Sequence, residues 1–230
     1  MPRAAELLAV DRPLVIAHRG NSSDAPENTL PAFASALQLG VQAIELDFQQ
    51  TNDGELVVFH DDTLCRTTNA TWVWKQAQRK VADVTLAELR QLDAGSWFSP
   101  AFLATRIPTL DEALEGMTHL CATVMTPRDF GPPTRSPRAH FKLLLNQELP
   151  ALDGQASEAD FVQKSELAVA LLFGSERYGM TNEDVYRCHV ALSIPTNPTY
   201  GSLNIAAAVQ LIAYDWCQAL AAHGGGWGAQ

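Results

Sequence analysis

Several features that mark other classes of protein are missing from this sequence of 230 residues. No apolar run reaches the roughly 18 residues that suggest a membrane-spanning helix. The first residues, MPRAAELLAVDRP, also lack the apolar core of roughly 7–15 residues that is found in a signal peptide. These absences predict a cytoplasmic protein without a membrane span.

Cysteine is scarce, and the four cysteines are far apart: Cys65, Cys121, Cys188 and Cys217. None belongs to a CxxC pair, which is a common sequence sign of a zinc site. Small secreted proteins that depend on disulfides carry cysteines at a much higher density. The spacing therefore argues against both zinc and a disulfide framework.

Basic residues are outnumbered in both halves of the chain, whose net charge is −10. Residues 1–112 contain 9 basic and 15 acidic side chains, and residues 113–230 contain 7 and 11. Strong nonspecific binding to nucleic acid needs a basic surface. The acidic charge of both halves argues against strong nonspecific nucleic-acid binding. It does not exclude an RNA site that recognises the shape of the RNA.

Hydrophobic residues make up 47% of the chain and charged residues 18%, which is typical of a globular protein. The length allows one large domain or two small ones. Alternating strands and helices predict an α/β fold throughout. The expected strands are 14–17, 43–48, 55–60, 119–125, 168–173 and 190–194, and the expected helices are 30–39, 85–92, one from 108 onward, and 202–220. Residues 127–139 are expected to form an ordered loop.

Local signals define the ends of these elements. Thr29 is a suitable N-cap for the first helix, and Thr85 with Glu88 has the pattern of a capping box. The turn sequence at 52–54 predicts a hairpin between the strands on either side of it. Ser202 is expected to cap the last helix.

Three expected strands carry residues with chemical functions near their ends. The first ends in His18 and Arg19, the second contains Glu45 and Asp47, and the third ends in His60. The two carboxylates are two positions apart on one strand, so both are expected on one face. The carboxyl ends of parallel-type strands meet at one rim, where barrel enzymes have their active sites.

These residue types together suit the hydrolysis of a phosphodiester. Two carboxylates on one face favour magnesium or calcium, and two nearby histidines can act as general base and general acid. Arg19 can hold a phosphate group, and a bound metal ion would assist the displacement. Taken singly, each histidine could be structural and the carboxylates could belong to a solvated strand face.

At this point the sequence resembles a known family. The segment 17–69, which begins AHRGNSSDAPENTL, and the segment 84–114, VTLAELRQLDAGSWFSPAFLATRIPTLDEAL, resemble the glycerophosphodiester phosphodiesterases. The resemblance covers roughly residues 12–114, about half of that family's barrel. It implies cleavage of a glycerophosphodiester to glycerol 3-phosphate and an alcohol.

The resemblance also implies roles for individual residues. His18 and His60 would be the acid/base pair, and Arg19 would contact phosphate. Glu45 and Asp47 would bind the metal, and Glu27 would support the site. That family takes a further metal carboxylate from a later strand, and the next expected strand here, residues 119–125, contains none.

The second half has two loops with the features of a small-ligand site. Gly174, at a strand end, would let a ligand approach the backbone. The segment 201–204 opens a helix whose free amides could bind a polar group. Ordinary turn glycines remain the alternative from the residues alone.

The string LLFGSERYGMTNEDVYRCHVALSIPTNPTYGSLNIAAAVQLIAYD resembles motifs of the SpoU/TrmH-type (SPOUT) RNA 2′-O-ribose methyltransferases, TrmJ branch. The resemblance implies a deep trefoil knot whose 194–204 loop wraps S-adenosylmethionine, a homodimer through the knot, and tRNA as a partner. The implied cofactor contacts are Thr123, Val124, Met125, Gly174, Ile194, Gly201, Ser202 and Leu203. Glu176 and Asn204 would shape the loops. That family's first motif, with its catalytic arginine, is replaced here by phosphodiesterase-like sequence.

The sequence therefore predicts a composite α/β chain. A partial, TIM-barrel-like βα layer (1–112) would precede a trefoil-knot SPOUT half (113–220) and a frayed tail (221–230). The predicted function is metal-assisted glycerophosphodiester hydrolysis joined to methylation of tRNA or rRNA by S-adenosylmethionine. The alternatives are a methyltransferase as the main function, or an inactive chimeric or truncated fusion that only binds S-adenosylmethionine.

Overall fold

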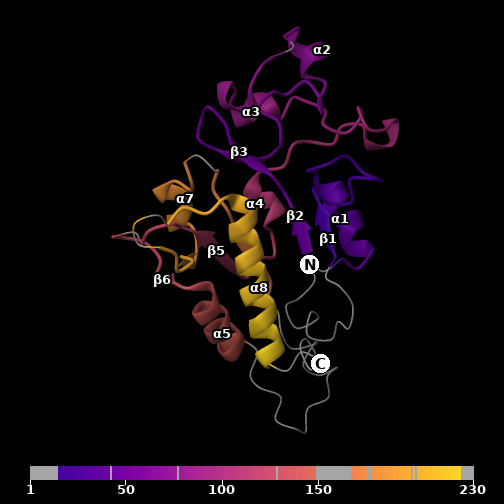
Figure 1. The fold of residues 1–230 in the computed structure, drawn as a ribbon. Coiled ribbons are helices and arrows are strands. Elements are labelled where there is room, and N and C mark those ends of the chain that lie inside the picture. The colour runs from indigo at the N-terminus through magenta and orange to yellow at the C-terminus, as the bar shows by residue number, and fades with distance from the viewer. Residues whose placement is uncertain are drawn as a thin grey trace. The chain divides into compact units, whose positions relative to one another are not determined.

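A computed structural model describes residues 15–41, 43–76, 78–127, 129–148, 167–175, 178–197, 199 and 201–223. These residues fall into two compact units, and the division comes after Glu115 (Figure 1). The first unit holds the segments rich in histidine, arginine and carboxylate residues. The second holds the glycine-containing loops.

The first unit is built from short elements: β1 (Ile16–His18), α1 (Leu30–Gln38), β2 (Ala43–Glu45), β3 (Phe48–Gln50), β4 (Leu56–Val58), α2 (Ala70–Trp74), α3 (Leu86–Leu89), α4 (Leu110–Ala113), and 3₁₀ turns at Val81–Asp83 and Pro100–Phe102. Strands β1 and β2 are parallel, and β3 and β4 form an antiparallel hairpin. The hairpin predicted from the turn at 52–54 is confirmed.

Hydrogen-bonding caps begin the helices of this unit. The Thr29 side chain accepts a backbone N–H at the start of α1. Thr85 with Glu88, and Thr109 with Glu112, form complete capping boxes at α3 and α4. Each cap satisfies donors that have no partner inside the helix. The caps predicted at Thr29 and Thr85 are confirmed.

The single strand expected over 43–48 is wrong, because β2 ends at Glu45 and a separate strand, β3, begins at Phe48. Asn28 stabilises this interruption of the strand. Its Oδ1 accepts the backbone N–H of Asp47 at 3.2 Å, and its Nδ2 donates to Asp47 Oδ2 at 3.0 Å. These bonds replace those that a continuous strand would make. Strand alternation therefore does not place Glu45 and Asp47 on one face.

The core of the first unit surrounds β4 and the loops that follow it. Val57, Leu64, Val81, Leu89, Leu92 and Ile107 are fully or almost fully buried in one cluster. Burial of this kind contributes roughly 1.5–3 kcal/mol per large aliphatic side chain. Packing against this cluster fixes the position of β4, the strand that leads into His60.

The second unit contains a sheet of four parallel strands in the order β6-β8-β5-β7. Its elements are β5 (His119–Thr123), β6 (Thr134–Arg135), α5 (Pro137–Glu148), β7 (Val169–Leu172), α7 (Asn182–Tyr186), β8 (Val190–Leu192) and α8 (Ile205–His223). Strand β5 pairs on both sides with strands of its own unit. The predicted mixed α/β class with parallel strands is confirmed.

Helices α5 and α8 pack together over this sheet (Figure 1). Phe141 of α5 is fully buried, and its ring meets Trp216 of α8 edge to face at 5.1 Å between centroids. Ile212 of α8 and Cys121 of β5 belong to the same buried cluster. The two helices thus cover a continuous apolar layer.

Two expected boundaries in this unit are wrong. The stretch 127–139, expected as a loop, contains β6 and the first turn of α5. The last helix begins at Ile205, and its cap is Asn204, whose Oδ1 accepts the Ala207 backbone N–H at 2.8 Å. Asn204 lies directly before the helix, where a capping side chain reaches the first-turn amides, whereas Ser202 lies too far upstream. The frayed tail expected over 221–230 is wrong for residues 221–223, which belong to α8, and its remaining residues lie outside the described part of the chain.

Helix α8 is long and apolar enough to cross a membrane, judged by its length and composition alone. It has 19 residues and a mean hydropathy of 1.3, although no uninterrupted apolar run of that length is present in the sequence. Core helices of soluble proteins can have the same length and composition. Ile212 and Leu220 of α8 are buried in the second unit.

Candidate active site

The first unit contains a continuous series of charged contacts that begins at Arg19 and ends at His60. Arg19 Nη1 donates to Glu27 Oε1 at 2.9 Å. Glu27 also accepts from Arg66 Nη1 and Nη2, at 2.9 and 2.7 Å. Arg66 Nε then donates to Asp61 Oδ2 at 2.6 Å, and Asp61 Oδ1 lies 2.6 Å from His60 Nδ1.

Arg19 is held in an unusual backbone conformation at the end of β1. Its φ is 59°, in the left-handed region, and the next residue, Gly20, has φ 83°. A Cβ on Gly20 would lie 2.8 Å from the Ala32 carbonyl carbon, so this turn requires glycine. The turn leaves the Arg19 side chain only 17% exposed, with its Nε 3.1 Å from Asp47 Oδ2. Strained positions of this kind are common at functional sites.

His18 lies at the same strand end but faces solvent. In the parallel pairing of β1 and β2 it lies opposite Glu45. Its Nε2 is 3.9 Å from Glu45 Oε2, and its side chain is 69% exposed. The structure therefore places His18, Arg19 and a carboxylate at one edge.

His60 follows β4 and is positioned by two neighbours. Gln49 Nε2 donates to the carbonyl oxygens of His60 and Asp61, at 2.8 and 2.7 Å. The short contact between Asp61 and His60 Nδ1 orients the ring and leaves Nε2 as the reactive nitrogen. The His60 side chain is 42% exposed, so a substrate can reach it.

The arginines keep the carboxylates of the series ionised. Hydrogen bonds from Arg66 lower the pKa of Asp61 to about 2, against burial that raises it, with a smaller contribution from His60. Hydrogen bonding to Arg66 also lowers the pKa of Glu27, and these partners raise the pKa of Arg66. At neutral pH Arg19, Glu27, Arg66 and Asp61 therefore carry alternating full charges, which stabilise one another.

Carboxylate oxygens are the correct donors for a hard cation at this edge. Magnesium is commonly held by one or two carboxylates together with water and substrate phosphate, so Glu45 and Asp47 fit it in number and chemistry. Among the described residues of the first unit, no set of three His, Cys, Asp or Glu side chains that includes these two has its ligand atoms close together. Water and phosphate oxygens would supply the other ligands.

Three positioning residues of this site did not emerge from the sequence pattern. Arg66 joins Glu27 to Asp61, Asn28 holds Asp47, and Gln49 holds the end of β4. All three residues stand inside the segment 17–69 that resembles the phosphodiesterases. Their contacts link residues as far as 39 positions apart, which spacing along a chain does not reveal.

Several residues expected around S-adenosylmethionine come together after β5 and β8 in the second unit. The Val124 N–H donates to the Leu192 carbonyl at 2.9 Å. Thr196 Oγ1 donates to the Gly201 carbonyl at 3.1 Å, and a Cβ on Gly201 would lie 3.7 Å from Met125 Cγ. Met125 is 62% exposed. The two loops therefore lie side by side and present an accessible surface.

The other expected cofactor residues are placed differently. A Cβ on Gly174 would lie 2.0 Å from the Gly179 carbonyl carbon, so the group that approaches Gly174 is the chain's own backbone. Ile194 packs against the apolar cluster of the sheet. Thr123 ends β5, Ser202 and Leu203 are exposed, and Glu176 lies outside the described residues.

The fold and site define a mixed α/β protein with an active-site-like series of histidine, arginine and carboxylate side chains. The model of the glycerophosphoryl diester phosphodiesterase family matches residues 18–161, more than half of the chain. The chain belongs to this family. The match continues past residue 112, where the predicted phosphodiesterase-like part ends.

Individual relatives show both resemblances. A glycerophosphodiester phosphodiesterase of Caldanaerobacter subterraneus is 52% identical over 102 residues, which are 44% of this chain and 39% of that protein. The tRNA (cytidine/uridine-2′-O-)-methyltransferase TrmJ of Photorhabdus laumondii is 38% identical over 112 residues, which are 49% of this chain and 40% of that protein. The chain is a composite of a phosphodiesterase-type domain and a TrmJ-like region, as predicted.

Solved structures of both kinds are also similar to parts of the chain. A glycerophosphoryl diester phosphodiesterase from Silicibacter pomeroyi is 34% identical and has a TM-score of 0.40; the match covers 49% of this chain and 43% of that one. The chain spans about two fifths of the length of the curated relatives of either kind named above.

Proposed function

We propose that the first unit hydrolyses small phosphodiesters of the glycerophosphodiester type and releases glycerol 3-phosphate and an alcohol. The observation that carries this proposal is the series of ion pairs from Arg19 to His60. This series orients the guanidinium of Arg19, which could bind phosphate, and the imidazole of His60. The charged side chains between them connect the two residues. The family membership supports the same substrate class.

Arg19 is the proposed phosphate ligand. Among the described residues its Nε contacts Asp47 and its Nη1 contacts Glu27, so we assign Nη2 to a phosphate oxygen. A guanidinium fixed by two carboxylates is already oriented, which lowers the entropy lost on binding. Magnesium held by Glu45 and Asp47 would neutralise part of the phosphate charge.

The two histidines would move the protons. A water oxygen forms a bond to phosphorus while the bond from phosphorus to the alcohol oxygen breaks. His60 Nε2, supported by Asp61 at Nδ1, takes the proton of the water. His18 gives a proton to the leaving alcohol oxygen, so the net reaction consumes one water and leaves the phosphate monoester and the alcohol.

The first prediction tests this activity directly. The purified chain, incubated with glycerophosphocholine and magnesium or calcium, is expected to release glycerol 3-phosphate, measured by a coupled dehydrogenase assay. His18→Ala is expected to lower kcat by roughly 10²–10⁴-fold, because it removes the general acid. His223→Ala, in the other unit, is the control and should leave the rate unchanged. Absence of product with every divalent metal tried would refute the proposal.

We propose further that the second unit binds S-adenosylmethionine, in line with its TrmJ-like sequence. The approach of Met125, Thr196 and Gly201 in neighbouring loops supports this site. The proposal includes the finer assignments for the chain: a partial barrel layer, a trefoil knot, a homodimer through the knot, tRNA as the methyl acceptor and a cytoplasmic location.

The second prediction concerns this cofactor. Isothermal titration calorimetry with S-adenosylhomocysteine is expected to show one site per chain. Gly201→Leu should weaken binding by about tenfold or more, since a Cβ there would already lie 3.0 Å from Thr196 Oγ1. Gln210→Ala, an exposed position on α8, is the matched control. No heat of binding with the unaltered chain would exclude the site, and binding without methyl transfer to tRNA would define a binding module alone.

A further inference from the structure

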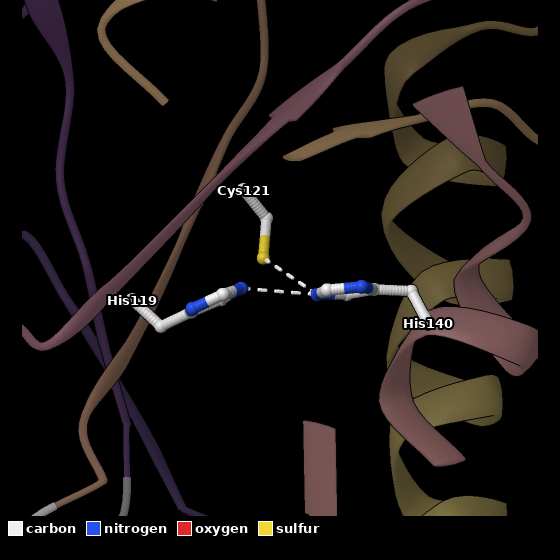
Figure 2. Close-up of side chains that lie close together, drawn as sticks. All are labelled: His119, Cys121 and His140. Atoms are coloured by element: carbon white, nitrogen blue, oxygen red, sulfur yellow. Dashed lines mark hydrogen bonds between the residues drawn. The ribbon is translucent and has the colours of Figure 1, made fainter. Parts of the chain in front are cut away.

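A cluster of three metal-ligand side chains lies in the second unit, apart from every residue assigned above. His119 Nε2 is 3.0 Å from His140 Nε2, and Cys121 Sγ is 3.9 Å from the same nitrogen. All three ligand atoms lie within 4.8 Å of one another. Figure 2 shows the sulfur of Cys121 and the ring of His119 both directed toward the same nitrogen of His140.

Two well-packed elements bring these ligands together. His119 and Cys121 are two residues apart on β5, so their side chains point to the same face of the sheet. His140 comes from α5, next to the fully buried Phe141. Cys121 is fully buried, His140 is 6% exposed, and His119 is half-buried. Cys121 and His140 are therefore fixed by the surrounding packing, and solvent or an ion can reach the cluster past the half-buried His119.

The arrangement of the two rings favours a cation between them. Two imidazole nitrogens at 3.0 Å need either one shared proton or a positive ion. On the other side of the His140 ring, Nδ1 is buried and has no hydrogen-bond partner among the described residues. Coordination of an ion at Nε2 would place the ring proton on Nδ1, where a water molecule could accept it.

Two of the three separations in the cluster are close to those of a tetrahedral ion. Metal bonds of about 2.05 Å to nitrogen and 2.3 Å to sulfur imply roughly 3.3 Å between two nitrogens and roughly 3.6 Å between nitrogen and sulfur. The observed separations of 3.0 and 3.9 Å differ from these by a few tenths of an ångström. Small rotations of the His119 and Cys121 side chains would close the difference.

The ring of His119 is also held in place by a neighbouring histidine. The ring of His189 stacks on it with centroids 4.9 Å apart. His189 Nδ1 accepts the Leu120 backbone N–H at 2.9 Å, which fixes the position of that ring against β5. A fixed neighbour of this kind lowers the freedom that a ligand must lose on binding metal.

We propose that His119, Cys121 and His140 bind a transition-metal ion of the zinc class. One thiolate and two imidazoles suit zinc, and they do not suit magnesium or calcium, which prefer oxygen. Binding releases the proton of the Cys121 thiol to solvent. Three protein ligands leave a fourth position for water on the His119 side. The site is independent of the proposed hydrolase and methyltransferase activities.

The third prediction tests the site with cobalt(II) as a spectroscopic substitute for zinc. Titration of the full, metal-free chain is expected to produce one equivalent of a thiolate-to-cobalt charge-transfer band together with strong visible bands of tetrahedral cobalt. Zinc should remove both by competition. Cys121→Ala is expected to abolish the charge-transfer band and to weaken zinc binding, measured against a chromogenic chelator, by more than about 100-fold.

Matched variants separate this site from other sources of the signal. Cys188→Ala removes another buried thiol of the same unit and should keep the band. The double variant Glu45→Gln/Asp47→Asn should also keep it, since oxygen ligands give no such band. His119→Gln, at a half-buried position, should lose the tetrahedral spectrum even if Cys121→Ala folds poorly. A wild-type titration without the charge-transfer band, or a band that persists in Cys121→Ala, would overturn the proposal.

Discussion

Replacement of His60 by alanine is expected to lower kcat for glycerophosphodiester hydrolysis by roughly 10²–10⁴-fold, the usual contribution of a general base. His60 is the end of the charged series, and its Nδ1 contacts Asp61 at 2.6 Å. No other described side chain in that series could accept a proton from water, because Asp61 and Glu27 are tied to arginines. KM should change little, since phosphate binding is assigned to Arg19.

Asp61→Asn tests whether the Asp61 carboxylate contributes to catalysis by orienting the His60 ring. The amide keeps the size of the side chain but can turn its N–H₂ group toward the ring and favour the wrong tautomer. We expect kcat to fall by about tenfold or more while KM is retained, and the pH profile of kcat to move. Asp62→Asn, at the adjacent exposed position, is the control. Equal rates for Asp61→Asn and Asp62→Asn would show that the contact is only structural.

Asp93→Ala is expected to destabilise the first unit by roughly 1–3 kcal/mol. Asp93 is 6% exposed, and its carboxylate accepts the backbone N–H groups of Gly95 at 2.9 Å, Ser96 at 2.7 Å, and Ala104. Loss of the acceptor leaves these donors without a partner, at a cost of roughly 1–3 kcal/mol for each one that stays buried. Gly95 is tightly enclosed, since a Cβ there would lie 2.1 Å from the Phe102 carbonyl oxygen.

Guanidinium unfolding monitored by circular dichroism would measure this effect as a lower midpoint. Asp83→Ala, at an exposed position in the same unit, should leave the midpoint nearly unchanged. Burial raises the pKa of Asp93, but the three backbone donors outweigh it and hold the pKa at about 2, below 3.8. Its contribution is therefore fully present above about pH 4 and is lost as the pH falls toward 2. An Asp93→Ala chain as stable as the unaltered one at pH 7 would contradict this account.

Local sequence signals predicted the local structure well. Thr29, Thr85 with Glu88, and the turn at 52–54 each act within a few residues, so their outcome depends little on the rest of the chain. The strand over 43–48 was wrong because Asn28, 19 positions before Asp47, competes for its backbone. The cap at Ser202 was wrong because Asn204 lies closer to the helix start.

The phosphodiesterase resemblance identified the residue types of the candidate site but not how they are connected. His18, Arg19, Glu45, Asp47 and His60 all lie in the first unit, as expected. Arg66 was not expected, although it supplies hydrogen bonds to both Glu27 and Asp61. A side chain that links distant segments has no periodic or short-range signal, so only the folded chain reveals it.

The sequence by itself therefore determined the composite α/β character, the family, the caps at Thr29 and Thr85, and the residues that carry charge at the first unit's strand ends. These depend on short-range hydrogen bonding and on motif identity. Only the tertiary structure decided the break before β3, the series from Arg19 to His60, and the meeting of His119, Cys121 and His140. The absence of a CxxC pair argued against zinc, yet packing of α5 on β5 brings three ligands together from positions up to 21 residues apart.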